Sequence, residues 1–260
     1  MHYVIAPELD PNLELVAIDG EQARHAIRVR RMQPGEPLVL LDGAGTSARA
    51  TVESSDKNGP NASWRLLVRL ERIQRHPRQR PEIHVVCPAP KGDLLETMID
   101  QLSQVGATSW RPLTSDRSER EPREGKLDRL GRVAQESAKQ CGRAWFFEIE
   151  KQISLESALA LPNAVLADAQ GLSPAELITQ GLADRQASHI HVLIGPEGGF
   201  SSRERSLAQE AGLGMMNLGP HVLRIGTAAV VAASGLVHTL GRGVPDSSRP
   251  EASAGERARE

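Results

Sequence analysis

Residues 189–240 decide the fold, and they read HIHVLIGPEGGFSSRERSLAQEAGLGMMNLGPHVLRIGTAAVVAASGLVHTL. The apolar run 191–194 predicts a buried strand, which ends in a sharp turn at GPEGG, residues 195–199. A second apolar run, 215–218, predicts another short strand and is followed by a Gly-Pro turn at 219–220. Because glycine adopts backbone conformations that side chains forbid, both turns can be tight.

Each of these turns leads into the start of a helix. Ser201 and Glu204 have capping-box spacing at the first start, and Ala, Val and Leu fill a long helix from Thr227 onward. Ligands of open α/β sheets bind beyond the carboxyl ends of the strands, where free N–H groups at helix starts act as donors. Two such turns together favour a ligand crevice, although either glycine motif alone is consistent with a simple turn.

The residues of both turns resemble a known signature. The segments GPEGGFSSRE and LGPHVLRIGTAA are similar to the C-terminal motifs of the RsmE family, SPOUT-class enzymes that methylate N3 of uridine in 16S ribosomal RNA with S-adenosylmethionine. Gly226 stands where the family usually has glutamate. The matching positions are Gly195, Pro196, Glu197, Gly198, Gly199, Leu218, Gly219, Leu223, Arg224, Thr227 and Ala228.

Composition is that of an ordinary soluble protein. The chain has 260 residues, a length typical of one or two domains, with 39% hydrophobic and 25% charged residues. Aromatic residues make up only 3%, so aliphatic side chains must form the core. Because the net charge is −2, any basic surface for nucleic acid must be local.

Several classes of protein are excluded by composition. No apolar run has the length of a membrane span, and the N-terminus lacks the pattern of a signal peptide, so we expect a cytoplasmic protein. Cys87 and Cys141 are far apart, which favours free thiols over a disulfide. No Cys/His cluster has zinc spacing, so no metal is expected.

Residues 1–76 are predicted to form a small β-barrel domain. Its basic helix, expected at 19–32, contains HAIRVRRMQPGE, which is similar to the N-terminal segment of the family. The resemblance implies a PUA-like domain that binds RNA through Arg24, His25, Arg28 and Arg31. From composition alone, a solvated basic face is an equally good interpretation. Strands are expected at 3–6, 38–41, 49–53 and 64–73, with an exposed loop at 54–63.

Residues 77–242 are predicted to form a second, α/β domain. The basic, proline-punctuated stretch 74–81 suits a linker, and strands alternate with helices from residue 83 onward. This alternation predicts a mostly parallel sheet covered by helices on both faces. The resemblance implies more, namely a SPOUT fold with a C-terminal trefoil knot. Residues 243–260 have little apolar content and are expected to form a disordered tail.

Local signals predict the helix starts and turns of this domain. Asp93 and Glu96 have capping-box spacing, and Gly106 is expected to end the helix that they begin. A strand is expected at 164–167, leading to Asp168-Ala169-Gln170-Gly171, and Ser173 is expected to cap the helix that follows.

The resemblance also assigns roles to site residues. Arg224 and Arg143 would favour the deprotonated uridine, and Glu197 would orient an arginine or the amino group of the cofactor. Arg117 would hold RNA or the target base, or would lie in solvent. Glu136 and Gln140 share a helix face that is either surface or a site wall. The residues expected to bind S-adenosylmethionine are Leu166, Ala167, Gly195, Pro196, Glu197, Gly198, Gly199, Leu218, Gly219, Leu223, Arg224 and Thr227.

Two functions remain open at this stage. The first is methyl transfer to 16S ribosomal RNA within the 30S subunit, by a homodimer to which helix 227–240 contributes unless it is plain core. The second is RNA binding with weak or no methyl transfer, because Gly226 and Gln101 depart from the family pattern. A dinucleotide-dependent oxidoreductase is disfavoured, since GPEGG lacks GxGxxG spacing.

Overall fold

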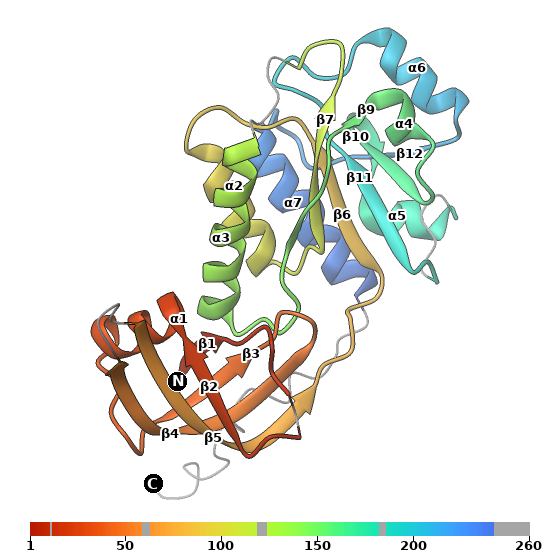
Figure 1. Ribbon diagram of the computed structural model, residues 1–260. Coiled ribbons are helices and arrows are strands. Elements are labelled where there is room, and N and C mark those ends of the chain that lie inside the picture. Colours follow the sequence, from red (N-terminus) through yellow and green to blue (C-terminus); the bar gives the residue numbers. More distant parts are fainter. Residues whose placement is uncertain (11, 59–62, 119–123, 182–185, 242–260) are drawn as a thin grey trace, which may run out of the picture.

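A five-stranded sheet forms the N-terminal part of the chain (Figure 1). The structure is a computed structural model, and it describes residues 1–10, 12–58, 63–118, 124–181 and 186–241. The strand order is β1-β3-β4-β5-β2, with β1 and β3 parallel and the other pairs antiparallel. Alternate side chains of the strands face a core that helix α1 (Gly20–Arg24) covers. The strands are β1 (His2–Ile5), β2 (Leu15–Asp19), β3 (Pro37–Leu41), β4 (Thr46–Asn58) and β5 (Ser63–Arg75).

The long hairpin of β4 and β5 corrects the sequence prediction. The expected loop at 54–63 is wrong at both ends, because β4 continues to Asn58 and β5 already begins at Ser63. Polar residues are tolerated there since they pair across the hairpin, as Asp56 does with Arg65. Strand β2 was not expected. Among the described residues no ladder joins β1 to β2, so a closed barrel stays a prediction.

The expected basic helix is present, but it is shorter and changes type. Helix α1 is followed directly by one π-helical turn, His25–Val29, and the chain then reverses at Arg31, whose φ is +55°. Ala23 and Ala26 are buried against the sheet, so the basic side chains are left on the outside.

A seven-stranded parallel sheet forms the second half of the protein, which confirms the predicted α/β class. The order is β12-β10-β11-β6-β7-β8, and β9 also pairs with β7. All pairs are parallel. The strands are β6 (Glu82–Cys87), β7 (Ser109–Thr114), β8 (Glu148–Ile149), β9 (Ile153–Ser154), β10 (Ala164–Leu172), β11 (His189–Leu193) and β12 (Gly214–Met216).

Helices cover both faces of this sheet, as predicted (Figure 1). One face buries Val85 and Val192 against α2 (Leu94–Gln104), α3 (Glu124–Cys141), α5 (Pro174–Thr179) and α7 (Ile225–Leu240). The other buries Val86 and Leu193 against α4 (Leu155–Leu159) and α6 (Ser202–Glu210). No helix in the described ranges has the length and apolar character needed to cross a membrane.

The structure shows which of the predicted capping boxes form at the helix starts. The capping boxes predicted at Ser173 and Ser201 are both present. The one predicted at Asp93 is wrong, because its backbone is already helical and its side chain makes no cap hydrogen bond. Glu96 instead pairs with Arg129 at 2.9 Å.

Strand β10 corrects a second expectation. The predicted strand end at Ala167 is wrong, since the strand continues to Leu172 with an irregularity in its pairing to β12. Gly171 permits this, because a Cβ there would lie 2.4 Å from the Met215 carbonyl oxygen. The expected tail, 243–260, lies outside the described residues, and the trefoil knot stays a prediction.

Candidate functional site

The site is built at the carboxyl edge of three neighbouring strands. Strands β12, β10 and β11 are adjacent and parallel, so the segments that follow them emerge at the same edge of the sheet (Figure 1). Leu166 of β10 is level with Leu193 of β11 and Met215 of β12. This register places 166–167, which lie within β10, level with the ends of β11 and β12, after which 195–199 and 218–219 follow.

Glycines shape the first turn, 195–199. A Cβ on Gly195 would lie 3.0 Å from the Phe200 nitrogen and 3.2 Å from the Gly199 carbonyl carbon, both backbone atoms that cannot easily move. Gly199 has φ +65°, and its N–H donates to the Pro196 carbonyl at 2.8 Å. Glu197 and Gly198 are exposed, so this turn presents its backbone to a ligand.

The loop after β7 supports the first turn. Arg117 donates from Nη1 to the carbonyl oxygen of Gly198 at 2.6 Å. This contact was not anticipated, since the sequence left Arg117 either on RNA or in solvent. The guanidinium is exposed, so it can contact the turn and a ligand together.

A buried carboxylate fixes that loop against the start of α6. Glu204 is only 1% exposed, and its carboxylate accepts hydrogen bonds from the backbone N–H groups of Asp116 at 2.8 Å and Ser201 at 2.6 Å. Ser201 Oγ in turn donates to Asp116 Oδ2 at 2.9 Å. A buried charge needs such partners. Sequence reasoning identified Glu204 as a cap but missed that it also anchors the loop of Arg117.

The second turn is held by an asparagine that sequence reasoning missed. Asn217 accepts from the Gly219 N–H at 2.7 Å and donates from Nδ2 to the Ala169 carbonyl at 2.6 Å. Gly219 has φ +118°, which favours glycine. An asparagine two residues before a glycine is a turn signal, because its side chain can accept from that backbone N–H, and it would have located this residue.

Helix α7 begins beside these turns. Arg224 is its N-cap residue, with extended backbone, and both Arg224 and Thr227 are exposed while Leu223 is half-buried. Neither Arg224 nor Glu197 is in an ion pair within the described part of the chain, so both charges are available. A Cβ on Gly226 would meet Met98 Cβ at an ordinary 3.7 Å.

Arg143 does not join this group within the chain. It precedes β8 and therefore lies at the amino edge of the sheet, whereas Glu197 follows β11 at the carboxyl edge. Its Nη1 donates to the carbonyl of Ser103 near the end of α2 at 2.8 Å. Burial lowers the pKa of Arg143 to about 10. The Arg143 guanidinium thus connects the segment after α3 with the end of α2 at the amino edge of the sheet.

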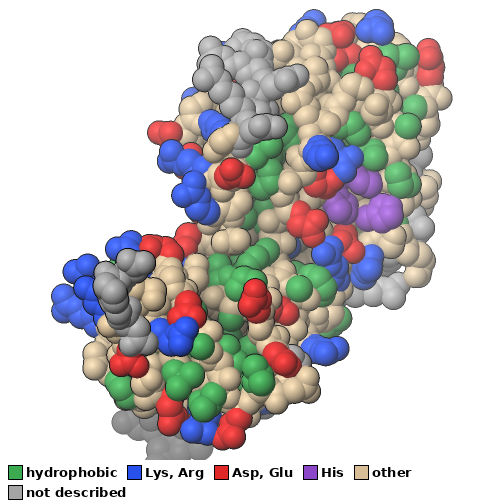
Figure 2. Space-filling model, viewed as in Figure 1, with side chains coloured by type: hydrophobic (Ala, Val, Ile, Leu, Met, Phe, Trp, Pro, Cys, Tyr) green, Lys and Arg blue, Asp and Glu red, His purple; other side chains and the backbone are tan. Residues whose placement is uncertain are grey.

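The basic residues of the N-terminal domain divide into two groups. Arg24 is paired with Glu21 at 2.6 Å, and Arg28 lies over the Trp64 ring at 5.8 Å. Both, like Arg31, are exposed, and Figure 2 shows basic side chains gathered where α1 lies. His25 is instead half-buried, and burial together with nearby Lys139 lowers its pKa.

His25 lines a groove between the N-terminal sheet and α3, which we call the junction groove. It is lined by Met1, Tyr3, His25, Arg30, Glu136 and Gln140, among others. Glu136 and Gln140 are both exposed, on the rim of this groove, and they lie away from the carboxyl-edge site in this chain. Gln101 is exposed on α2.

Three histidines form a separate cluster on the sheet, purple in Figure 2. The rings of His84 and His191 stack at 4.8 Å, and those of His189 and His191 meet edge to face at 5.4 Å. No group of three or more His, Cys, Asp or Glu in the described ranges is arranged to hold a metal ion.

Comparison with known protein families covers most of the chain. A family described as RNA methyltransferase domain matches residues 77–237, and one described as RNA methyltransferase PUA domain matches residues 18–62. The Ribosomal RNA small subunit methyltransferase E of Mycobacterium tuberculosis is 32% identical over 226 residues, covering 84% of each chain.

Solved structures share the fold. A probable rRNA-methyltransferase from Porphyromonas gingivalis superimposes with a TM-score of 0.78 at 25% identity, covering 92% of this chain and 98% of that one. The Ribosomal RNA small subunit methyltransferase E of Neisseria gonorrhoeae, bound to S-adenosyl methionine, has a TM-score of 0.76 at 20% identity, covering 93% and 98%.

Proposed function

The chain belongs to the RNA methyltransferase family, and we propose that it methylates N3 of a uridine in 16S ribosomal RNA of the 30S subunit with S-adenosylmethionine. Its relationship to ribosomal RNA small subunit methyltransferase E within that family is the basis of this proposal. The observation that carries the proposal is the convergence of the two glycine turns and the start of α7 at one sheet edge. This is the place where α/β sheets bind ligands.

The residues at this edge fit the proposed cofactor. Leu218 and Leu223 are half-buried and give apolar surface for an adenine ring, while Gly198 and Gly219 leave backbone exposed for hydrogen bonds. S-adenosylmethionine supplies an activated methyl group, so the protein has to bind and orient rather than generate it. The residues that would hold it are Leu166, Ala167, Gly195, Pro196, Glu197, Gly198, Gly199, Leu218, Gly219, Leu223, Arg224 and Thr227.

Arg224 is the candidate for activating the base. Uridine N3 carries a proton and becomes nucleophilic when that proton leaves, and a neighbouring positive charge favours the deprotonated form. Arg224 is exposed at the site edge and has no carboxylate partner in the described residues. Glu197 would orient an arginine or the amino group of the cofactor. Arg143 would not serve in this chain, because it lies at the opposite edge. A paired uridine would have to be flipped out of its helix.

The same proposal includes the assembly and its organisation. We propose that two copies pair through α7, a largely apolar helix on which Val231 is 40% exposed. Residues 1–76 would form a closed PUA-like barrel and residues 77–242 a SPOUT domain whose last helix is threaded as a trefoil knot. The protein would act in the cytoplasm, where 30S subunits are assembled.

Transfer of labelled methyl groups to unmodified 30S subunits tests the function. We expect incorporation at one uridine N3, with Arg224→Gln slowing it about 10²-fold, as loss of one charge-stabilising donor does. Arg132→Gln, which changes an exposed arginine on α3, is the control and should retain full activity. RNA binding without incorporation by the wild type would leave the alternative, an RNA-binding protein without methyl transfer.

A further inference from the structure

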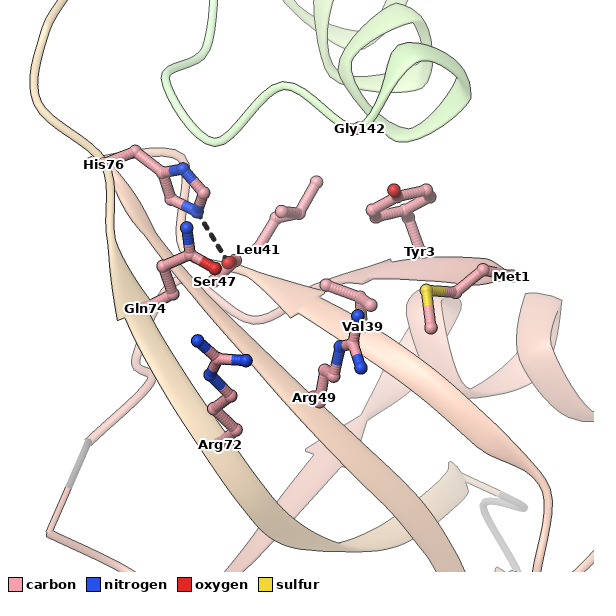
Figure 3. A pocket seen from close by; sticks show the side chains of 10 residues that line it. All are labelled: Met1, Tyr3, Val39, Leu41, Ser47, Arg49, Arg72, Gln74, His76 and Gly142. Atoms are coloured by element: carbon pink, nitrogen blue, oxygen red, sulfur yellow. Dashed lines mark hydrogen bonds between the residues drawn. The ribbon is translucent and has the colours of Figure 1, made fainter. Parts of the chain in front are cut away.

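Two arginines face each other on the outer side of the N-terminal sheet. Arg49 of β4 pairs in register with Arg72 of β5, on the face opposite the buried Ala48 and Ala50. Figure 3 shows both guanidinium groups projecting from the same side of the two strands. Their side chains enter a groove that Gln74 and His76 also line.

This pairing is unfavourable in the protein alone. Like charges directly opposite each other on neighbouring strands are destabilising. Arg65 and Arg69, on the same strand as Arg72, have carboxylate partners, for example Asp19 at 2.7 Å from Arg65. Within the described residues, Arg49 and Arg72 have none. An anion between them would relieve the repulsion.

The rest of the groove suits an anion as well. None of the described side chains that line it is acidic. Ser47 Oγ and His76 Nε2 are hydrogen-bonded at 2.7 Å, which places two polar groups beside the arginines (Figure 3). The groove therefore combines positive charge with hydrogen-bonding groups, as a phosphate requires.

The groove adjoins a second one, which indicates a chain of phosphates rather than a single ion. Met1 and Tyr3 line both this groove and the junction groove, where His25 and Arg30 lie. Gly142 packs directly on Tyr3, since a Cβ on it would be 2.7 Å from the Tyr3 hydroxyl. The groove is thus bounded by the sheet on one side and by the end of α3 on the other, and its enclosed volume of about 30 Å³ leaves no room for a duplex.

We propose that Arg49 and Arg72 bind backbone phosphates of a single-stranded RNA segment that continues past Tyr3 into the junction groove. The site extends the contact surface beyond α1 to the opposite face of the N-terminal sheet. It rests on the proposed function, because that function makes RNA the substrate. A basic groove that follows the backbone beside an aromatic ring is a common mode of single-strand binding.

The salt dependence of RNA binding tests this site. Affinity of the full chain for unmodified 16S ribosomal RNA is measured over a range of salt concentrations. Each phosphate contact on a single strand contributes about 0.7 to the slope of log K against log salt, so Arg49→Gln with Arg72→Gln should reduce the slope by about 1.4. Removing the repulsion should also leave the thermal unfolding midpoint unchanged or raised.

A matched double variant controls for net charge. Arg65→Gln with Arg69→Gln removes two positive charges from the same sheet, but from arginines already paired with carboxylates, so its slope should equal that of the wild type. An unchanged slope in the Arg49/Arg72 variant, or an equal fall in both variants, would overturn the proposal. Failure of the proposed function would show differently, as absence of methyl transfer by a wild type that still binds RNA through this pair.

Discussion

Gly226 stands in the first turn of α7, at the position where the resemblance noted in the sequence implies a glutamate. The backbone is not in the left-handed region, and a Cβ would make only an ordinary contact with Met98. Gly226→Glu should therefore raise the free energy of unfolding by about 1 kcal/mol, since a side chain restricts the unfolded chain and an acid suits a helix N-terminus. Urea unfolding measures the change.

The Gly226→Ala variant separates the effect of adding a side chain from the effect of adding a negative charge at the start of α7. Alanine supplies the helix propensity without the charge, so the excess of Glu over Ala should shrink as salt is added. A glutamate variant less stable than the alanine variant would show that the site rejects the acid.

Glu150 provides a test of pH dependence. Burial alone would raise its pKa, but hydrogen bonds with His84, Ser109 and Arg111 outweigh that effect and lower the pKa to about 2. A carboxyl with a lowered pKa stabilises the fold above its ordinary pKa of 4.5 and loses that contribution as the pH falls toward 2. The wild type should lose stability over this window by up to about 1.4 kcal/mol per pH unit more than Glu150→Gln.

Urea unfolding followed by circular dichroism at several pH values between 4.5 and 2 gives the slope of the free energy of unfolding against pH. Glu156→Gln, at an exposed position on α4, should keep the wild-type slope. If Glu150→Gln also kept it, the carboxylate would not be paired in solution as the structure places it.

At the scale of elements, replacing a glycine by alanine should change the stability in opposite directions at two positions, one in a helix and one in a strand. Gly131 lies within α3, and a Cβ there would meet nothing within 4 Å, so Gly131→Ala should stabilise the protein by about 0.5–1 kcal/mol. Gly171 lies in β10 against the backbone of β12, so Gly171→Ala should destabilise it by about 1–3 kcal/mol. Thermal unfolding compares them, and shifts of the same sign would contradict the packing.

Elements were predictable where their signals were local. The caps of α5 and α6 depend on hydrogen bonds between residues three apart, so sequence spacing was sufficient to identify them. Asp93 and Glu96 have the same spacing, but the helical backbone at Asp93 and the partner Arg129 depend on tertiary packing. Strands β8 and β9 have two residues each, and only their pairing with β7 defines them.

At the scale of the whole molecule, the turns could be predicted but their assembly could not. GPEGG and the Gly-Pro turn are visible in the sequence, whereas the order β12-β10-β11 that brings them together depends on the sheet topology. The position of Arg143 likewise could not be predicted from its motif, which suggested a catalytic role. Arg143 follows α3 and therefore lies at the amino edge of the sheet, away from the candidate site. Asn217 was missed because its partner, Ala169, lies on the part of β10 beyond the predicted strand end at Ala167.

The proposed dimer belongs to the scale of the whole molecule, and a substitution of one exposed side chain on α7 can test it. Val231 is 40% exposed, while its neighbours Ala232 and Ala233 are buried. If two copies pair through this face, Val231→Glu places a charge in an apolar contact, which strongly disfavours association. The wild type should sediment as a dimer and the variant as a monomer. Its affinity for S-adenosylmethionine should also fall if each copy completes the other's site.

Leu13→Glu provides the control for this experiment. Leu13 is 50% exposed, so the substitution adds the same charge to an apolar surface position in the N-terminal domain. We expect this variant to remain dimeric with wild-type cofactor affinity. A wild type that sediments as a monomer, or a Val231→Glu variant that stays dimeric, would show that the exposed face of α7 is not the contact. The exposed valine would then be an isolated surface side chain, which soluble proteins commonly carry.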